Sequence, residues 1–305
     1  MEIGRVEFKS GFVSIIGLPN AGKSTLLNSI IKENIAITSR KAQTTRMNLK
    51  GIYNDEESQI VFTDTPGIND GKTLLDGYMK KSVSKALIDI DLILVIVDIN
   101  KFENENYTKI CSLIVKNNIK KILVINKFDV YDGDTKVAVE AIKDKFINID
   151  FSDVILVSAL KNKNIKELIS LIKKSLPNGM PYYDKDDLTD SPIRKIVADM
   201  IRQQCLYKLD KEVPHSLDVI VDSMKTSKTK CLNIMATIVC DRESHKSIII
   251  GKHGDMIKNI GTGARINIEK FMNKKVNLKL TVIVRENWRD ERTLLANYGY
   301  DNDLI

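Results

Sequence analysis

A glycine-rich segment near the start of the chain has the spacing of a phosphate-binding loop. Residues 17–24 read Gly-Leu-Pro-Asn-Ala-Gly-Lys-Ser, which fits the pattern GxxxxGK[ST]. Glycines let successive backbone N–H groups point at the phosphates of a nucleotide, and the N-terminus of a following helix strengthens the attraction. Lys23 is then expected to reach the β- and γ-phosphates, and Ser24 to bind Mg²⁺. The alternative is a glycine turn that fits by chance, and a predicted strand before it and helix after it weigh against that.

A second short motif supplies a carboxylate for the same metal ion. Residues 64–67 read Asp-Thr-Pro-Gly and follow a run that the sequence predicts to be a strand. At the end of a strand Asp64 can hold Mg²⁺ through a water molecule, and the N–H of Gly67 can meet the γ-phosphate. Glycine turns after strands are common, so this motif carries weight through its position in the chain.

Two further motifs select the base. Residues 126–129 read Asn-Lys-Phe-Asp and follow an apolar run, which places them where open α/β sheets bind ligands. The Asp129 carboxylate can accept from both N1–H and the 2-amino group of guanine, donors that adenine lacks. Residues 158–160, Ser-Ala-Leu, can offer a backbone N–H to guanine O6. We therefore expect GTP or GDP to be bound by Gly17, Asn20, Ala21, Gly22, Lys23, Ser24, Thr25, Asp64, Gly67, Asn126, Lys127, Asp129, Ser158, Ala159 and Leu160.

A different motif lies in the last third of the chain. Residues 251–254 read Gly-Lys-His-Gly between two helical patterns, as in the loop with which KH domains clamp single-stranded nucleic acid. The residues expected to contact RNA are Gly251, Lys252, His253 and Gly254, and the apolar residues expected to line a groove for bases are Ile249, Ile250, Met256 and Ile257. An ordinary turn between two helices is the alternative for the tetrapeptide alone.

The elements around these motifs predict two kinds of domain. Before residue 178, short apolar runs alternate with helical patterns, which is typical of a mostly parallel sheet covered by helices. The expected strands are Phe12–Ile16, Leu49–Tyr53, Gln59–Thr63, Leu92–Ile99, Lys121–Ile125 and Val154–Val157, with a hairpin between the second and third. Later the order becomes helix, strand, strand, helix, GXXG, helix, strand and a terminal helix from Asn287. We place the domains at 1–178 and 192–305, with a proline-containing linker at 179–191.

Composition agrees with two globular domains. The chain has 305 residues, and its longest strongly apolar stretch, Leu92–Val97, is far shorter than the ~20 residues that span a bilayer. The four cysteines are widely spaced and form no CxxC pair, so we expect reduced thiols. Net charge is +7, and residues 225–292 hold 15 lysines and arginines against 7 acidic residues. The basic bias favours a phosphate-backbone partner for the second domain, with a solvated basic face as the alternative.

The order GLPNAGKS, DTPG, NKFD and SAL, together with Gln-Thr-Thr-Arg at 43–46, closely resembles the Era GTPases. The α-β-β-α-GXXG-α-β order after residue 192 is similar to the KH domain of that family. One departure is Gln203, where many relatives carry glutamate. The resemblance implies an α/β P-loop GTPase domain with a mixed, mostly parallel sheet, followed by an α+β KH domain of type II.

The same resemblance implies residue roles and partners. The catalytic residues would be Lys23, Thr45 and Gly67, and the ligands of Mg²⁺ would be Ser24, Thr45 and Asp64, with Thr44 as the alternative to Thr45. The implied partner is the 3′ end of small-subunit ribosomal RNA, and the implied role is maturation of the small ribosomal subunit. We expect a cytoplasmic monomer, with peripheral contact at the inner face of the cell membrane as known for the group.

The chain lacks the glutamine that orients the attacking water in Ras-like GTPases. Position 68 is Ile68, where Ras-like enzymes carry the glutamine that orients water, so catalysis must rely on backbone groups, Mg²⁺, a second cation or a partner. Related GTPases with asparagine at the position of Asn20 use it to hold K⁺, and a turn-forming asparagine is the alternative. Two other functions share part of this pattern: a GTPase that serves transfer-RNA modification, and an RNA-binding module whose nucleotide site has no turnover.

Overall fold

The computed structural model describes residues 7–68, 71–115, 117–228 and 230–304. The chain divides into two compact units, each described here by itself. Unit 1 comprises Met1–Ala36, Thr45–Asp70 and Met79–Asp190, and unit 2 comprises Ile37–Thr44, Gly71–Tyr78 and Ser191–Ile305. The domain limits expected from the sequence remain predictions.

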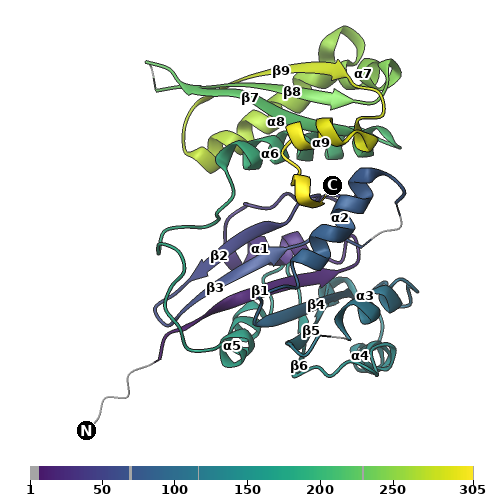
Figure 1. Ribbon diagram of the computed structural model, residues 1–305, viewed down its shortest axis with the longest axis vertical. Helices are drawn as coiled ribbons and strands as arrows, with labels where there is room; N and C mark the ends of the chain where they lie inside the picture. The colour runs from purple at the N-terminus through teal and green to yellow at the C-terminus, as the bar shows by residue number, and fades with distance from the viewer. Residues whose placement is uncertain (1–6, 69–70, 116, 229, 305) are drawn as a thin grey trace. The chain divides into compact units, whose positions relative to one another are not determined.

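Unit 1 is built on a six-stranded sheet with the order β2-β3-β1-β4-β5-β6 (Figure 1). β2 runs antiparallel to β3, as the expected hairpin requires, and the other neighbouring strands are parallel. This confirms the mixed, mostly parallel sheet. The strands are β1 (Lys9–Gly17), β2 (Leu49–Asn54), β3 (Ser58–Asp64), β4 (Leu92–Asp98), β5 (Lys120–Asn126) and β6 (Asp153–Val157).

Helices cover this sheet because its central strands are apolar on both faces. Every residue of β4 is buried, which is why its sequence reads as a continuous apolar run and not as an alternating one. Alternate β4 residues Ile93, Val95 and Val97 belong to a core that also takes in side chains from α3 and α4. The helices are α1 (Lys23–Ile31), α2 (Leu74–Lys85), α3 (Tyr107–Ile114), α4 (Thr135–Lys145) and α5 (Ile165–Ser175).

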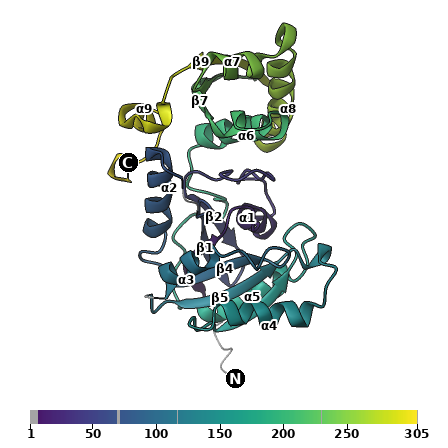
Figure 2. The same cartoon turned by 90° about the vertical axis from the view of Figure 1, so that its right-hand side faces the viewer.

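Unit 2 contains a three-stranded sheet with the order β7-β8-β9, in which β7 is antiparallel and β9 parallel to β8. Figure 2 shows α6 and α8 against this sheet, and their apolar residues share one core with it. None of the helices in the described ranges is long and apolar enough to span a bilayer. The strands are β7 (Leu217–Thr226), β8 (Leu232–Cys240) and β9 (Val276–Val284), and the helices are α6 (Ile193–Lys208), α7 (Glu243–Ile250), α8 (Asp255–Met272) and α9 (Arg292–Asn297).

The C-terminal region differs in detail from the expectation. Instead of one helix from Asn287, a 3-10 turn at Trp288–Asp290 precedes the short helix α9. Asn287 itself has a left-handed backbone with φ of 53°, which an α-helix cannot include. Trp288 anchors this region to the core, since the residue is fully buried and its Nε1 donates to the carbonyl of Ser216.

The expected linker is held along an edge of the unit 1 sheet. The Ile52 N–H of β2 donates to the carbonyl of Leu188 at 2.9 Å, and the Thr189 hydroxyl donates to the carbonyl of Lys50 at 2.6 Å. β2 is an edge strand, and an edge strand has unpaired backbone groups that invite such pairing. Residues 179–190 therefore belong to unit 1.

Within unit 2, the segment Ile37–Thr44 is hydrogen-bonded to α6. The carbonyl of Thr38 accepts from Nε2 of Gln203 at 3.0 Å and from the hydroxyl of Tyr207 at 2.8 Å. A glutamate at position 203 has no N–H to donate to that carbonyl. The departure from the family pattern at Gln203 thus changes one local hydrogen bond.

Candidate functional site

The phosphate loop leaves β1 at Gly17 and enters α1 at Lys23. Two of its residues have left-handed backbones, Asn20 with φ of 64° and Gly22 with φ of 103°. A Cβ on Gly22 would lie 2.2 Å from Nδ2 of Asn126, so a side chain there would displace the residue that ends β5. The loop therefore lies directly against the base-recognition motif.

Lys23 is buried within this loop. Its Nζ donates to the carbonyls of Gly17 and Leu18, both at 3.0 Å, and only 6% of the residue is exposed. Burial lowers the pKa of Lys23 to about 8, and the nearby Asp64 carboxylate acts in the opposite direction. An anion bound in the loop would favour the charged ammonium, so nucleotide binding and protonation of Lys23 are coupled.

Three oxygen-bearing side chains converge at the end of β3. The hydroxyl of Ser24 donates to Oδ2 of Asp64 at 2.6 Å, and the hydroxyl of Thr45 reaches the same oxygen at 3.2 Å. The two hydroxyls are 2.9 Å apart. Thr44 faces elsewhere, because its hydroxyl contacts the Ser39 hydroxyl and the Lys41 carbonyl. Of the two candidate threonines, Thr45 is the one that lies beside Ser24 and Asp64.

This oxygen cluster fits a Mg²⁺ ion. Asp64 is fully buried, and its Oδ1 has no hydrogen-bond partner among the described residues. Burial raises the pKa of the Asp64 carboxyl, while the Lys23 charge and the hydroxyls of Ser24 and Thr45 oppose that rise. A divalent cation would satisfy the orphaned oxygen and compensate the buried negative charge. Hard oxygen ligands with room for water and phosphate are the environment that Mg²⁺ prefers.

The motif that follows β3 lies close over the phosphate loop. A Cβ on Gly67 would lie 2.8 Å from the backbone N and Cα of Pro19, so this approach requires glycine. Ile68 is partly buried and packs against the core formed by β4, α3 and α4. Its side chain contributes to packing, and it has no polar group with which to orient a water molecule.

Asn126 links the three nucleotide motifs. Its Nδ2 donates to the carbonyl of Ala21 at 2.9 Å, and its Oδ1 accepts from the N–H of Ala159 at 3.0 Å. The residue is the last of β5 and is 2% exposed. The phosphate loop, the end of β5 and the loop after β6 are therefore joined through one buried amide. This arrangement positions Asp129 and residues 158–160 around the expected place of the base.

Lys127 connects the base motif to a residue that the sequence did not single out. Its Nζ donates to the carbonyl of Asn20 at 2.6 Å and to Oδ2 of Asp98 at 2.7 Å. Asp98 ends β4 beside Asn126 and is 4% exposed. The sequence does contain a signal for Asp98, because it is the one carboxylate in a strand whose other residues are all apolar. Asp98 belongs to the site because it holds Lys127 over the phosphate loop.

The remaining expected nucleotide residues lie around this centre. Thr25, in the first turn of α1, and Asp129 are partly exposed, and Ala159 is 4% exposed. Ser158 is buried and its hydroxyl accepts from the N–H of Lys161, while Leu160 is 73% exposed. The structure thus places the predicted residues at one end of the unit 1 sheet.

In unit 2, the GXXG loop joins α7 to α8 as expected. Gly251, His253 and Gly254 have positive φ values of 73°, 52° and 82°. A Cβ on Gly251 would lie 2.7 Å from that of Met256, whereas a Cβ on Gly254 would meet no atom within 4 Å. Lys252 and His253 are exposed. The loop therefore presents its backbone and two cationic or polar side chains on the surface.

The prediction that Ile249 lines a groove for bases is wrong. Ile249 is fully buried in the core of unit 2, because it lies on the face of α7 that packs against the sheet. Ile250, Met256 and Ile257 are partly buried and remain accessible beside the loop. Exposed lysines on the loop, on α8 and in the chain from α8 into β9 are Lys252, Lys258, Lys270, Lys274, Lys275 and Lys279.

Comparison with family models agrees with the geometry of both units. Residues 12–127 match the family described as 50S ribosome-binding GTPase, and residues 212–289 match the KH domain family. These ranges include the phosphate loop and the GXXG loop, respectively. Each motif therefore occurs in the domain type that its local structure indicates.

Comparison with whole proteins covers nearly the full chain. GTPase Era of Clostridium kluyveri is 45% identical over 294 residues, which is 96% of this chain and 99% of that protein. A crystal structure of Era in complex with MgGDPNP and nucleotides 1506–1542 of 16S ribosomal RNA is similar, with a TM-score of 0.92 and 36% identity. An Aquifex aeolicus Era variant bound to GDP·AlF4⁻ has the same score and identity. Both cover 96% of this chain and 99% of the solved one.

Proposed function

This chain belongs to the Era family of GTPases, and we propose that it couples GTP hydrolysis to binding of the 3′ end of small-subunit ribosomal RNA. The reaction converts GTP and water to GDP and phosphate. The proposed role is maturation of the small ribosomal subunit. Support comes from the solved Era complex with 16S ribosomal RNA, whose chain is 36% identical to this one.

We propose the following roles at the nucleotide. Lys23 binds β- and γ-phosphate oxygens, and the Gly67 N–H donates to the γ-phosphate while water attacks phosphorus and the bond to the β-phosphate oxygen breaks. When bound, Mg²⁺ neutralises developing charge on the phosphates. Ser24 and Thr45 would hold the ion directly, and Asp64 through water. The convergence of these three side chains, with one carboxylate oxygen unsatisfied, supports the assignment.

The proposed coupling runs through the segments beside the γ-phosphate. Thr45 and Gly67 belong to unit 1, but the neighbouring segments Ile37–Thr44 and Gly71–Tyr78 belong to unit 2. A γ-phosphate that orders Thr45 and Gly67 would therefore act on chain continuous with the RNA-binding unit. The division of the chain supports a switch in which GTP changes how the KH unit is presented.

The observation that carries the RNA proposal is the glycine-bounded loop between α7 and α8. It is tested with a synthetic RNA of the small-subunit 3′ end, measured by fluorescence anisotropy with protein loaded with a non-hydrolysable GTP analogue or GDP. Gly254→Asp should weaken binding at least about tenfold, because it places a negative side chain where the backbone approaches phosphate. Binding should be tighter with the analogue than with GDP.

A matched control exists in the same unit. Gly299 also has a positive φ, 91°, and a Cβ there also meets no atom within 4 Å. Gly299→Asp introduces the same charge and a similar backbone penalty away from the loop, and it should leave RNA binding unchanged. Equal loss in both variants, or no binding by the unaltered protein, would remove the RNA target and leave the GTPase assignment intact.

We also propose that the protein acts as a monomer in the cytoplasm, with peripheral contact at the inner face of the cell membrane. The support is the resemblance to the Era group. Cell fractionation would test it, together with the mass of the purified protein by light scattering. A stable dimer, or absence from the membrane fraction at low salt, would contradict the corresponding part of the proposal.

A further inference from the structure

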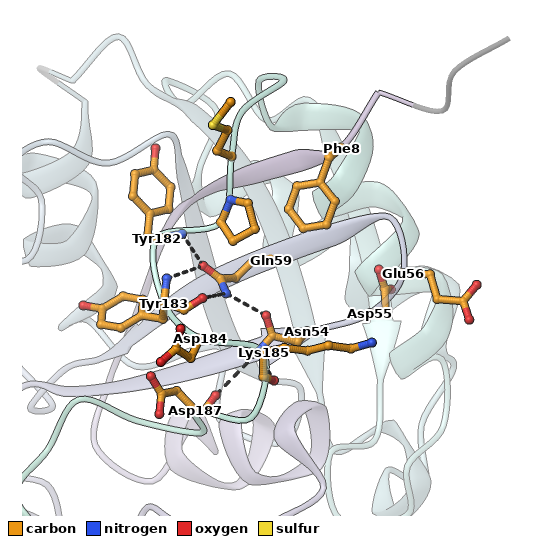
Figure 3. Close-up of a pocket in the computed structure, with 12 residues that line it drawn as sticks. Phe8, Asn54, Asp55, Glu56, Gln59, Tyr182, Tyr183, Asp184, Lys185 and Asp187 are labelled. Atoms are coloured by element: carbon orange, nitrogen blue, oxygen red, sulfur yellow. Dashed lines mark hydrogen bonds between the residues drawn. The ribbon is translucent and has the colours of Figure 1, made fainter.

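A groove of about 800 Å³ opens in unit 1 between the β2–β3 turn and residues 180–187 (Figure 3). Its wall begins at the start of β3, near Gln59, whereas Asp64 of the metal cluster ends the same strand. Asp64 lies five residues along the strand from Gln59, which separates the two places by about 17 Å. A ligand in the groove would therefore leave the nucleotide site free.

One buried amide builds the wall of the groove. Gln59 is fully buried, and its Oε1 accepts from the N–H groups of Tyr182 at 2.5 Å and Tyr183 at 2.9 Å. Its Nε2 donates to the carbonyl of Tyr183 at 2.9 Å and to Oδ1 of Asn54 at 2.7 Å. Asn54 in turn donates to the carbonyl of Lys185 at 3.0 Å. The loop is thus held to the sheet before any ligand arrives.

Aromatic and apolar side chains form part of the surface. Tyr182 is 54% exposed and packs with its ring centroid 4.6 Å from that of Phe12. Met180 is 84% exposed. Figure 3 shows the Phe8 ring on one side of the groove and Tyr183 on the other. Fixed aromatic rings beside an exposed methionine are typical of surfaces that bind other chains.

The charges around these rings have one dominant sign. Glu56, Asp184 and Asp187 line the groove and form no ion pair among the described residues, while Lys185 is the one basic lining residue there. A fourth carboxylate, Asp55, is paired with Lys173 at 2.6 Å. This acidic surface lies on a chain whose net charge is +7. It repels phosphate backbones and attracts cations.

We propose that this groove binds an arginine-bearing segment of a protein partner. A planar guanidinium can lie against the Tyr182 or Phe8 ring and donate to carboxylates in a bidentate arrangement. Lysine offers a point charge without the planar stacking surface. RNA is disfavoured by Glu56, Asp184 and Asp187.

The test uses full-length protein loaded with GDP at near-physiological salt and three fluorescent nine-residue peptides. One carries three arginines, the second lysines at those positions, and the third citrullines, which keep the planar shape without the charge. The arginine peptide should bind more tightly than the lysine peptide, and the citrulline peptide should not bind. Equal binding of the arginine and citrulline peptides, or of the arginine and lysine peptides, would overturn the proposal.

Variants locate the binding. Asp184→Asn with Asp187→Asn should weaken binding of the arginine peptide about tenfold, and Tyr182→Ala should do so while Tyr182→Phe does not. The matched control is Asp144→Asn with Asp150→Asn, which neutralises two exposed carboxylates elsewhere in unit 1. Equal loss in both double variants would show non-specific charge attraction and overturn the proposal.

Two further measurements separate binding from folding. The side-chain amide resonances of Gln59 should shift on addition of the arginine peptide, and the GTP hydrolysis rate of each variant should stay unchanged. Displacement of the peptide by a single-stranded RNA of similar length would identify the surface as an RNA site and overturn the assignment to a protein segment.

Discussion

At the scale of single residues, the nucleotide site depends on contacts between motifs as much as on the motifs themselves. Lys127 belongs to the base motif, yet its Nζ donates to the Asn20 carbonyl in the phosphate loop. The same Nζ also donates to the carboxylate of Asp98, which ends β4. Asp98 also accepts from the backbone and side chain of Asn100. A residue outside every sequence motif therefore helps to set the shape of the nucleotide pocket.

Replacing Asp98 should expose this dependence. In Asp98→Asn the short ion pair with Lys127 is lost, so the lysine is less firmly held over the phosphate loop. We expect GDP and GTP affinities to fall about tenfold, as for removal of one charged partner from a mostly buried pair. Fluorescent nucleotide binding measures the change. Asp150→Asn is the exposed control, and an affinity equal to that of the unaltered protein would contradict the role of Asp98.

The lowered pKa of Lys23 predicts proton uptake on nucleotide binding. With a pKa of about 8, about half of the protein has neutral Lys23 at pH 8, and bound phosphate should restore the charge. GDP binding in EDTA should therefore take up about half a proton at pH 8 and less at lower pH, so affinity falls as pH rises through 8. Calorimetry in two buffers of different ionisation enthalpy measures the uptake. Zero uptake at pH 8 would contradict the burial argument.

Asn20 predicts a response to monovalent cations. If this residue holds K⁺ near the developing charge, hydrolysis should be faster in KCl than in NaCl at equal ionic strength. Asn20→Gly keeps the left-handed backbone at φ of 64° accessible and should abolish the difference. Phosphate release in the two salts measures it. Equal rates for the unaltered protein would reject K⁺ as a cofactor.

At the scale of elements, periodicity and apolar runs located most strands and helices to within a few residues. β4 and β5 are recognisable because buried parallel strands are continuously apolar, and α1 because a phosphate loop precedes a helix. Residues 179–191 are expected from the sequence to be a linker, because prolines and acidic residues break both periodicities. Their position depends on Gln59, more than a hundred residues away, and such distant hydrogen bonds leave no local pattern.

The contribution of Gln59 can be measured directly. In Gln59→Leu the amide groups of Tyr182 and Tyr183 lose their acceptor, and a partner of Asn54 disappears. We expect the free energy of unfolding of unit 1 to fall by about 2–3 kcal/mol. Amide hydrogen exchange at Tyr182 and Tyr183 should accelerate.

The exposed Val137 on α4 provides a control. Val137→Ala should change the free energy of unfolding by no more than about 0.5 kcal/mol. Unchanged exchange at Tyr182 and Tyr183 in Gln59→Leu would show that residues 179–190 are held by other contacts.

The wrong prediction for Ile249 also arises from contacts that the sequence does not show. The sequence places four apolar residues near the GXXG loop, but it does not show which of them faces the core.

At the scale of the whole molecule, charge is unevenly distributed. Unit 2 carries the exposed lysines Lys270, Lys274, Lys275 and Lys279, while the groove in unit 1 is acidic. The two surfaces should therefore attract partners of opposite charge. The basic surplus of residues 225–292 can be predicted from composition. The acidic groove cannot, because its lining comes from segments that are distant in the sequence and meet only in the folded chain.

The basic surface predicts the salt dependence of RNA binding. If Lys274 and Lys275 both contact phosphates, replacing both with alanine should reduce the slope of log affinity against log salt by about 1.4. Anisotropy titrations over a range of KCl concentrations measure the slope. The matched control is Lys143→Ala with Lys145→Ala on α4, which should leave the slope unchanged. No change in either double variant would assign these lysines to a solvated surface.

The contacts of residues 179–190 with β2 also shorten the free chain that precedes α6. A free chain of that length would have a root-mean-square reach of about 20 Å. Asp190 is instead paired with Lys50 at 2.9 Å, and α6 begins at Ile193, so Ser191 and Pro192 alone lie between these points. Two residues extend at most about 7 Å, and proline fixes its own φ. The chain here can therefore turn only about the backbone dihedrals of these two residues, so a connection that would be flexible over a dozen residues is reduced to two.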